Sequence, residues 1–433
     1  MSASARCVLA PAAQQLMCQP VSDGEEQPNI VFGCHSVAGT TVSEVRAVAA
    51  ALVRRHEALR IRAVNAPLGT WFEVCGDYDP VLVVPGGDAD DVGWQEALAS
   101  KQLVSRLPID HGRPFRVVVA PAGDRLVVLF VAHHAICDGW ALYLLSREAD
   151  HLLRGRELPR RSAPTGALDV TEQVLAASHD PSVAGPALAF WEPHLRRSSE
   201  RVATARTRRT GRTPEVPPGA PFGCIRRTLS AEDGDRFLDR CRRLSLEPLA
   251  VVLHAAATAA RASEVSDTAD ATVVSVPFAA RTSAATHRVV CSISNVLPVT
   301  VPYGSSGAAT VDATVRAARD HLQVPAVALI AELRRRHRLP DRPELLVNFL
   351  PMGKYGDIDG SRALSAVPWL HVGSLPPWAS VALEVIAHRN APWHLVCAFR
   401  HGLVAERTAG EILSRFSEAL IGATANLELE KTR

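Results

Sequence analysis

The sequence lacks the cysteine pattern of a disulfide-bonded or zinc-binding protein. Its nine cysteines are an odd number with scattered spacing, and no C-x-x-C pair occurs among them. Disulfide frameworks and structural zinc sites both need paired or closely spaced ligands. We therefore expect no disulfide framework and no bound metal, a pattern that favours a reducing, cytoplasmic location.

Long apolar runs and a strong net charge are also missing. No stretch approaches the roughly 18 apolar residues of a membrane span, and no basic segment followed by an apolar run predicts a signal peptide. The 47 Lys and Arg residues nearly balance the 45 Asp and Glu residues, for a net charge of +2. Nucleic-acid-binding proteins typically carry a strong basic surface. We therefore expect neither a membrane nor a nucleic acid among the partners.

What the chain does have is length and alternating helix and strand patterns. Its 433 residues exceed the usual size of one compact core, so two domains or lobes are expected. The alternation of the two patterns indicates an α/β fold class. Residues 196–223 are rich in Arg, Thr, Ser, Pro and Gly, which predicts a linker or a long flexible loop there.

The clearest elements of the first half surround a strand that ends in two histidines. Thr41-Val42-Ser43-Glu44 is a capping box, which predicts a helix. Residues 115–120 and 125–133 favour strands, and the turn-forming residues between them predict an antiparallel hairpin. The second strand is apolar throughout residues 126–131, so we expect it to be buried on both faces. A helix over residues 140–153 should follow.

The second half repeats the alternation. Helical spacing predicts helices over residues 230–244, 246–262 and 409–423. Runs of β-forming residues predict strands over residues 273–277, 295–301 and 345–350, and a hairpin over residues 381–387 and 394–399.

The segment after the first hairpin combines residue types that acyl transfer requires. A strand brings His133 and His134 to its end, where only one of two adjacent side chains can face a cleft. Asp138 and Gly139 follow, just before a helix whose N-terminus offers free amides and a positive dipole. These parts supply a base, a carboxylate that orients the loop and donors for an oxyanion. Read alone, the segment fits catalysis and a structural histidine pair about equally, and Asp138 could also serve as a metal ligand.

The segment from His133 to Gly139 resembles the HHxxxDG motif of condensation domains. These domains belong to nonribosomal peptide synthetases and to the chloramphenicol-acetyltransferase-like superfamily. Further matches follow in order along nearly the whole chain: residues 55–60 are similar to the family's RHExLR segment, residues 109–116 to its D…gPLfR segment, residues 277–281 to its GtpvaGR segment, and residues 295–298 to its GxFxNTLPLR segment. Cys291, Ile293 and Thr300 stand where the family has Gly, Phe and Arg, which leaves substrate and partner open.

The resemblance implies two chloramphenicol-acetyltransferase-like α/β lobes in a V-shaped pseudo-dimer with mixed and antiparallel sheets. The N-terminal lobe would span residues 1–175 and carry the motif. The C-terminal lobe would span residues 176–433, with the flexible loop near residues 196–223. The chain has room for little beyond this unit, so we expect a free-standing, monomeric protein.

The resemblance also implies roles for the residues of the motif. His134 would face a channel and act as general base or position the acceptor, and Gly139 would supply a close backbone amide. His133 would pack on the opposite face. Asp138 is expected to be an architectural ion-pair partner of Arg55 or Arg281.

Four further residues lie close to these motifs. Trp140, Ser294 and Asn295 are candidate channel residues. Core packing of Trp140, and backbone hydrogen bonding by Ser294 and Asn295, are equally open alternatives. Cys137 lies inside the motif at a variable position, so we expect packing there rather than a nucleophile.

The function implied is a condensation reaction in nonribosomal peptide or antibiotic biosynthesis. An acyl or aminoacyl group would pass from a phosphopantetheine thioester on a peptidyl or acyl carrier protein to an amine or alcohol acceptor, forming an amide or an ester. No cofactor is expected on the chain itself. The alternatives are an acyl-CoA-dependent acyltransferase of the same fold and a catalytically silent platform that binds carrier proteins. An epimerase-type relative ranks lower, because its glutamate-bearing motif is not found.

Overall fold

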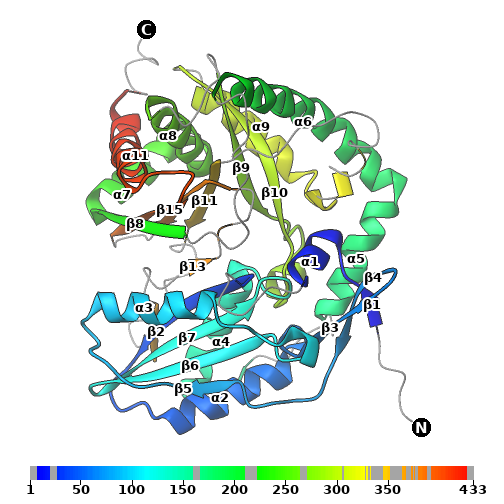
Figure 1. Ribbon diagram of the computed structural model, residues 1–433, viewed down its shortest axis with the longest axis vertical. Helices are drawn as coiled ribbons and strands as arrows, with labels where there is room; N and C mark the ends of the chain where they lie inside the picture. Colours follow the sequence, from blue (N-terminus) through cyan, green and yellow to red (C-terminus); the bar gives the residue numbers. More distant parts are fainter. Residues whose placement is uncertain are drawn as a thin grey trace. The chain divides into compact units, whose positions relative to one another are not determined.

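The computed structural model describes two compact units (Figure 1). The described residues are 7–19, 27–158, 166–209, 222–263, 271–304, 307–326, 328–329, 332, 345–351, 363–366, 372–373, 375, 379–387 and 392–426. The first unit comprises Met1–Asp180, Arg281–Ser294 and Ile358–Ser374, and the second comprises Pro181–Ala280, Asn295–Asp357 and Leu375–Arg433. Each unit is therefore discontinuous in sequence, whereas the division at residue 175 assigned neither of the two later segments to the first unit.

The first unit is built on a six-stranded mixed sheet. Its strands run in the order β12 (Leu364–Ala366), β2 (Asn29–Ser36), β7 (Arg125–His133), β6 (Phe115–Ala122) and β5 (Val81–Val83), and β13 (Val372–Gly373) also pairs with β2. β6 and β7 pair antiparallel and β5 pairs parallel with β6. This arrangement confirms the predicted hairpin, and every residue from Leu126 to Val131 is buried, as predicted.

Helices and a smaller sheet complete the first unit. The helices are α1 (Ala12–Met17), α2 (Val42–Arg55), α3 (Val92–Leu103), α4 (Gly139–Leu153) and α5 (Ala167–His179). The smaller sheet has the order β1 (Cys7–Leu9), β4 (Gly69–Val74) and β3 (Ile61–Ala66). α2 begins with the predicted capping box: the Glu44 N–H donates to Thr41 Oγ1 (3.2 Å), and the Thr41 N–H donates to Glu44 Oε2 (2.7 Å).

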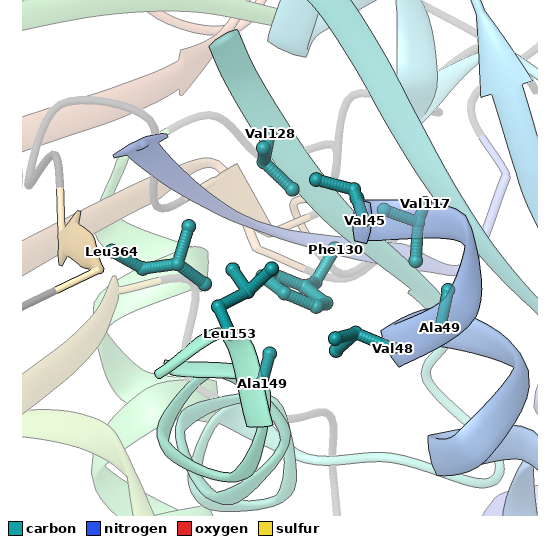
Figure 2. Close-up of a pocket in the computed structure, with 9 residues that line it drawn as sticks. All are labelled: Val45, Val48, Ala49, Val117, Val128, Phe130, Ala149, Leu153 and Leu364. Carbon is teal, nitrogen blue, oxygen red and sulfur yellow. The ribbon is translucent and has the colours of Figure 1, made fainter. Parts of the chain in front are cut away.

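α2 and α4 leave one small gap against the sheet (Figure 2). The cavity measures about 10 Å³ and is lined by apolar side chains of α2, α4, β6, β7 and β12, among them Val45, Phe130 and Leu153. A cavity of this size has room for about one water, and an apolar lining keeps such a space dry. It is therefore a packing gap and not a substrate site.

A segment distant in sequence forms the edge of this sheet. The Asp150 carboxylate of α4 accepts hydrogen bonds from the N–H groups of Ala363 (2.7 Å) and Leu364 (2.9 Å). Asp150 also pairs with Arg154, at 2.7 Å. These contacts hold β12 against β2, which would otherwise carry an open edge there.

The second unit has its own six-stranded mixed sheet. The strand order is β10 (Ser294–Pro302), β9 (Ala271–Ala279), β11 (Leu345–Pro351), β14 (Val381–Ala387), β15 (Trp393–Arg400) and β8 (Phe222–Leu229). β11 runs parallel to β9 and β14, whereas β15 runs antiparallel to β14 and β8. The predicted hairpin of β14 and β15 is thereby confirmed.

The core of the second unit lies on one face of this sheet. The helices are α6 (Pro181–Arg209), α7 (Ala231–Leu244), α8 (Pro248–Ala262), α9 (Gly307–Arg319) and α11 (Glu406–Asn426). Apolar residues of the helices meet alternate strand residues such as Leu383, Val385 and Leu395 in one buried cluster. The intervening strand residues point to the opposite face.

The loop predicted over residues 196–223 is partly wrong. α6 continues to Arg209, so residues 196–209 are helical, and residues 210–221 lie outside the described residues. Arg, Ala and Glu are good helix formers, and their propensity outweighs a composition that is otherwise typical of loops. In the described part of the chain, no helix has both the length and the apolar character needed to cross a membrane.

Candidate active site

The two histidines at the end of β7 lie in different environments. His133 is buried, and its Nδ1 accepts a hydrogen bond from the Ala135 N–H (3.3 Å). Burial, assisted by the neighbouring His134, lowers the pKa of His133 to about 3. Its ring is therefore neutral and fixed, which suits the structural role implied by the resemblance.

His134 begins the turn after β7 and is only partly buried. Its backbone N–H donates to the Pro28 carbonyl at 2.6 Å, which fixes the main chain. The ring nitrogen Nδ1 is buried and has no hydrogen-bond partner among the described residues. Because buried polar atoms are nearly always hydrogen-bonded, the missing partner distinguishes this nitrogen from those of His133.

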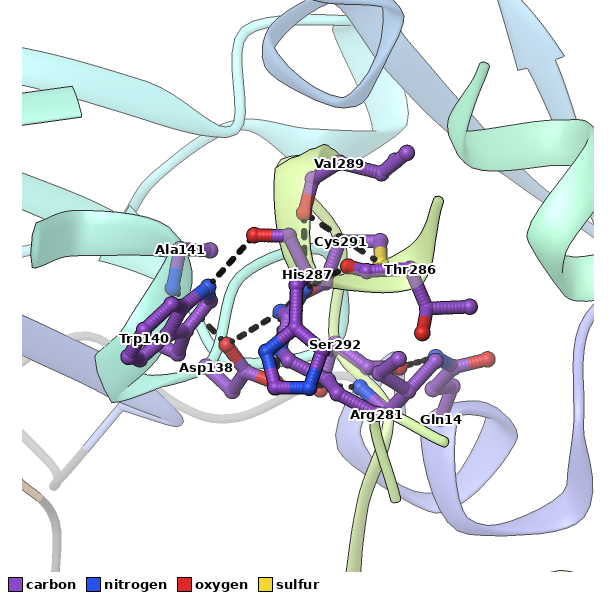
Figure 3. A network of polar contacts seen from close by, with 11 residues as sticks. Gln14, Asp138, Trp140, Ala141, Arg281, Thr286, His287, Val289, Cys291 and Ser292 are labelled. Carbon is purple, nitrogen blue, oxygen red and sulfur yellow. Dashed lines mark hydrogen bonds and ion pairs between the residues drawn. The ribbon is translucent and has the colours of Figure 1, made fainter. Parts of the chain in front are cut away.

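Asp138 accepts four hydrogen bonds from three donor groups (Figure 3). It caps α4, where its Oδ1 accepts from the Ala141 N–H at 2.9 Å. Nη2 of Arg281 donates to both carboxylate oxygens, at 2.8 and 3.0 Å, and the Ile293 N–H donates to Oδ2 at 3.2 Å. A carboxylate so occupied fixes the start of the helix and is not placed to transfer a proton.

Arg281 in turn fixes the segment in which it lies. Its Nη1 donates to the carbonyls of Thr286 (2.6 Å) and Val289 (2.8 Å), and its Nη2 to that of Cys291 (2.9 Å). Burial alone would lower the pKa of Arg281, but the charge and hydrogen bonds of Asp138, with smaller contributions from nearby cysteines, raise it instead. The guanidinium thus stays charged and joins Arg281–Ser294 to the start of α4.

The alternative pairing of Asp138 with Arg55 is wrong. Nε of Arg55 instead lies 3.1 Å from Glu148 Oε2, and the same oxygen contacts His56 Nε2 at 2.7 Å. Glu148 belongs to α4, so the residues that resemble RHExLR join α2 to α4. Arg55 is the last residue of α2, and its side chain is engaged by Glu148 of α4.

Open space adjoins the first residue of α4. Gly139 is exposed, and a Cβ atom placed on it would meet nothing within 4 Å. Packing within the described chain therefore does not require glycine there. The first N–H groups of a helix have no intrahelical acceptor, so this end of α4 presents donors to the open space at Gly139.

Two neighbours of Gly139 are committed to packing. The Trp140 Nε1–H donates to the His287 carbonyl (2.9 Å), and the rings of these two residues meet edge to face. Cys137 is fully buried, and burial, with the Asp138 charge, raises the pKa of its thiol well above the usual value. Cys137 is thus protonated at neutral pH and offers no thiolate.

Asn295 belongs to the second unit. Its side chain makes hydrogen bonds to the backbone, which was the alternative to a channel position. Its Nδ2 donates to the carbonyls of Leu322 (2.8 Å) and Val324 (3.0 Å), and its Oδ1 accepts from the Ala326 N–H (3.0 Å). The amide is buried and engaged on both sides. Ser294, its partly buried neighbour, is the last residue of the first unit's second segment.

The first unit therefore gathers His133, His134, Asp138, Gly139, Trp140 and Arg281 in one region. Sequence reasoning missed Gln14 of α1, whose side-chain amide nitrogen Nε2 donates to the Ser292 carbonyl at 2.7 Å. A lone glutamine in a short helix carries no pattern that could have indicated this contact. Across the described residues, no three His, Cys, Asp or Glu side chains are grouped as a metal ion would need.

Comparison with curated proteins finds short stretches of similarity to two fungal synthetases. Nonribosomal peptide synthetase 2 of Cochliobolus heterostrophus (strain C4 / ATCC 48331 / race T) is 41% identical over 58 residues, or 13% of this chain. Nonribosomal peptide synthetase sirP of Leptosphaeria maculans is 27% identical over 135 residues, or 29% of this chain. The matches span only 1% and 6% of the length of these relatives.

Solved structures share the fold over nearly the whole chain. The condensation domain from Monacolin K polyketide synthase MokA has a TM-score of 0.77 at 17% identity, with 98% of this chain and 99% of that one covered. The first condensation domain of the calcium-dependent antibiotic synthetase, in complex with a substrate analogue, has a TM-score of 0.75 at 15% identity, with 97% of both chains covered. The epimerization domain from the third module of tyrocidine synthetase B has a TM-score of 0.72 at 13% identity, with 98% and 99% covered.

The mixed α/β architecture with mixed and antiparallel sheets is thus that of two-lobed condensation domains. Because a domain named for epimerization shares it, the fold alone does not select one reaction. The condensation-domain family model matches residues 7–432, which is nearly the full length. This chain therefore belongs to the condensation-domain family.

Proposed function

We propose that the protein transfers an acyl or aminoacyl group from a phosphopantetheine thioester on a carrier protein to an amine or alcohol acceptor, with formation of an amide or ester. The observation that carries the proposal is Nδ1 of His134, which is buried without a partner among the described residues, five positions before the open start of α4. Membership of the condensation-domain family supports the reaction class. The short matches to nonribosomal peptide synthetases support a role in nonribosomal peptide biosynthesis.

His134 acts on the acceptor. Its ring takes the proton of the attacking hydroxyl, or orients an amine that arrives neutral, as the nucleophile adds to the thioester carbonyl. The backbone N–H at Gly139 donates to the oxygen that becomes negative. The tetrahedral adduct then collapses: the C–S bond breaks, and the phosphopantetheine sulfur leaves as a thiol with the proton given up by the nucleophile. Asp138 and Arg281 touch neither reactant, and hold the start of α4 in place for both steps.

The test is the substitution His134→Ala. We expect a loss of transfer rate of about 10²- to 10⁴-fold, which is the usual contribution of a positioned acid–base group. Products would be measured by mass spectrometry after mixing a loaded carrier protein with candidate acceptors. His111→Ala changes a histidine that is 72% exposed and serves as the control. Unchanged turnover in a folded His134→Ala protein would exclude the assignment.

The donor is decided in the same assay. Equal amounts of an acyl group are offered on a carrier protein and on coenzyme A, with one acceptor. We expect transfer from the carrier protein only, whereas faster transfer from acyl-CoA would favour the acyl-CoA-dependent alternative. A tight carrier complex with no transfer from either donor would favour the silent platform.

A further inference from the structure

Pro28 and Asn29, at the start of β2, lie beside both histidines of the motif. Asn29 pairs in register with His133 at the end of β7. One residue further along, the Pro28 carbonyl accepts the His134 N–H at 2.6 Å. This hydrogen bond continues the antiparallel ladder of β2 and β7 past the end of both strands. The position of the His134 main chain therefore depends on where the start of β2 is held.

The start of β2 is in turn fixed by the end of α3, which lies against this strand (Figure 1). Asn29 is fully buried, and its Nδ2 donates to the carbonyls of Gln102 and Ser105, both at 2.8 Å. The Gln27 N–H donates to the Leu103 carbonyl at 2.7 Å. The last carbonyls of a helix have no donor within the helix, so these bonds both cap α3 and tie it to β2.

The two bonds of Asn29 Nδ2 also set the orientation of its amide. A primary amide carries both of its N–H donors on the nitrogen, and both donors here meet carbonyl oxygens. The opposite orientation would place Oδ1 against the same two carbonyls, which is repulsive. Oδ1 is buried and has no hydrogen-bond partner among the described residues. Within the described chain, Asn29 is therefore anchored by its nitrogen alone.

A second buried amide joins the same two elements away from the histidines. Gln95 of α3 is fully buried, its Nε2 donates to the Ala89 carbonyl at 2.6 Å, and its Oε1 lies 2.8 Å from His35 Nε2. His35 and Asn29 lie near opposite ends of β2. Both amides thus help α3 to dock on β2, but only Asn29 adjoins the residue that holds His134.

We propose that Asn29 is a positioning residue for His134. Its amide anchors the start of β2 to the end of α3, and the adjoining Pro28 carbonyl thereby fixes the main chain of His134. Because Asn29 is fully buried, it acts through the backbone and not on a reactant. The effect on catalysis rests on the transfer activity proposed above, whereas the effect on the His134 main chain does not.

The first test compares the kinetics of Asn29→Leu and Gln95→Met. Each substitution replaces a buried amide with an apolar side chain of similar length. We expect Asn29→Leu to lower kcat by about 10- to 100-fold and to change KM for the acceptor less than about twofold, because a misplacement of about 1 Å can cost about 100-fold in rate. Gln95→Met should keep kcat within about twofold of the natural value. Equal kcat in the two folded variants would overturn the proposal.

The second test measures hydrogen exchange of the His134 amide by NMR and needs no substrate. A backbone N–H that is bonded inside a stable part of the fold exchanges slowly. We expect Asn29→Leu to speed this exchange at least about tenfold and Gln95→Met to leave it unchanged. Asn29→Ser keeps one hydroxyl donor and replaces Asn29→Leu if that variant does not fold, with a smaller increase expected. Natural exchange at His134 in either folded Asn29 variant would overturn the proposal.

The failure of one proposal can be told from that of the other. Faster exchange at His134 in Asn29→Leu, together with full transfer by His134→Ala, would contradict the proposed function and support the anchoring by Asn29. Loss of transfer in His134→Ala, together with the natural kcat in Asn29→Leu, would do the reverse. If both proposals hold, kcat falls in both variants, and only Gln95→Met keeps the natural rate.

Discussion

Asp138 and His134 lie four residues apart and differ in how fully their polar atoms are hydrogen-bonded. Asp138 has every contact a carboxylate needs, whereas His134 keeps a buried nitrogen without a partner among the described residues. The motifs predicted an ion pair of Asp138 with either Arg281 or Arg55, because a buried charge requires an opposite one, and the structure shows the pair with Arg281. The motif could not predict the N–H donors of Ala141 and Ile293, since backbone donors leave no trace in residue identity.

Asp138→Ala should reduce stability before it affects any chemistry. The substitution removes a helix cap and leaves the buried Arg281 guanidinium without its counter-charge. Losing one partner of a buried pair typically costs about 3–5 kcal/mol of the free energy of unfolding. Urea denaturation measures this loss, and Asp110→Ala, which breaks an exposed pair with Arg106, should cost less than about 1 kcal/mol. Full stability of Asp138→Ala would contradict the architectural role.

His133 should make the protein sensitive to mild acid. Its pKa is about 3 in the folded protein and about 6.5 in the unfolded chain, so the unfolded chain binds the proton first as the pH falls. Stability is therefore complete above pH 6.5 and is lost progressively toward pH 3. Between pH 7 and pH 5 the expected loss is about 2 kcal/mol. Urea titrations of the natural protein and of His133→Gln at both pH values measure it, and identical losses in the two proteins would contradict it.

At the scale of elements, helices and strands with strong local sequence patterns were predicted correctly, whereas those with weak patterns were not. The hairpin of β6 and β7 has two apolar strands and a turn between them, and α2 has a capping box. β2 was missed, although it lies beside β7 in the sheet, because Gly33, Cys34 and His35 interrupt its apolar run. α6 was read as a loop over residues 196–209 because composition was weighed above helix propensity.

The capping box of α2 should contribute measurably to stability. Thr41→Ala removes the acceptor of the Glu44 N–H and should cost about 1 kcal/mol of the free energy of unfolding. Ser43→Ala, two residues after the cap in the same helix, should be neutral or slightly stabilising, because alanine has the higher helix propensity. Chemical denaturation of both variants measures the difference. If Thr41→Ala were as stable as the natural protein, the cap would not contribute to the start of α2.

At the scale of the whole molecule, sequence order and spatial grouping differ. A boundary near residue 175 lies close to Asp180, where the chain first leaves the first unit. The return of Arg281–Ser294 and of residues near Leu364 depends on contacts between residues more than 100 positions apart. Local patterns contain no information about such contacts, and only the likeness of Pro277–Arg281 to a family segment pointed toward one of them. The V-shaped arrangement and the monomeric state stay predictions.

The discontinuous first unit has a consequence for synthesis on the ribosome. Residues up to Asp180 emerge without Arg281 and without β12 and β13, which complete the sheet at β2. Roughly 100 further residues must be translated before Arg281 appears and roughly 190 before β13 is complete, which takes on the order of 5–20 s and 10–40 s at 5–20 residues per second. The nascent chain exposes an uncompensated Asp138 for the shorter time and an open strand edge for the longer one, so the first half of the protein should be a client of ribosome-associated chaperones.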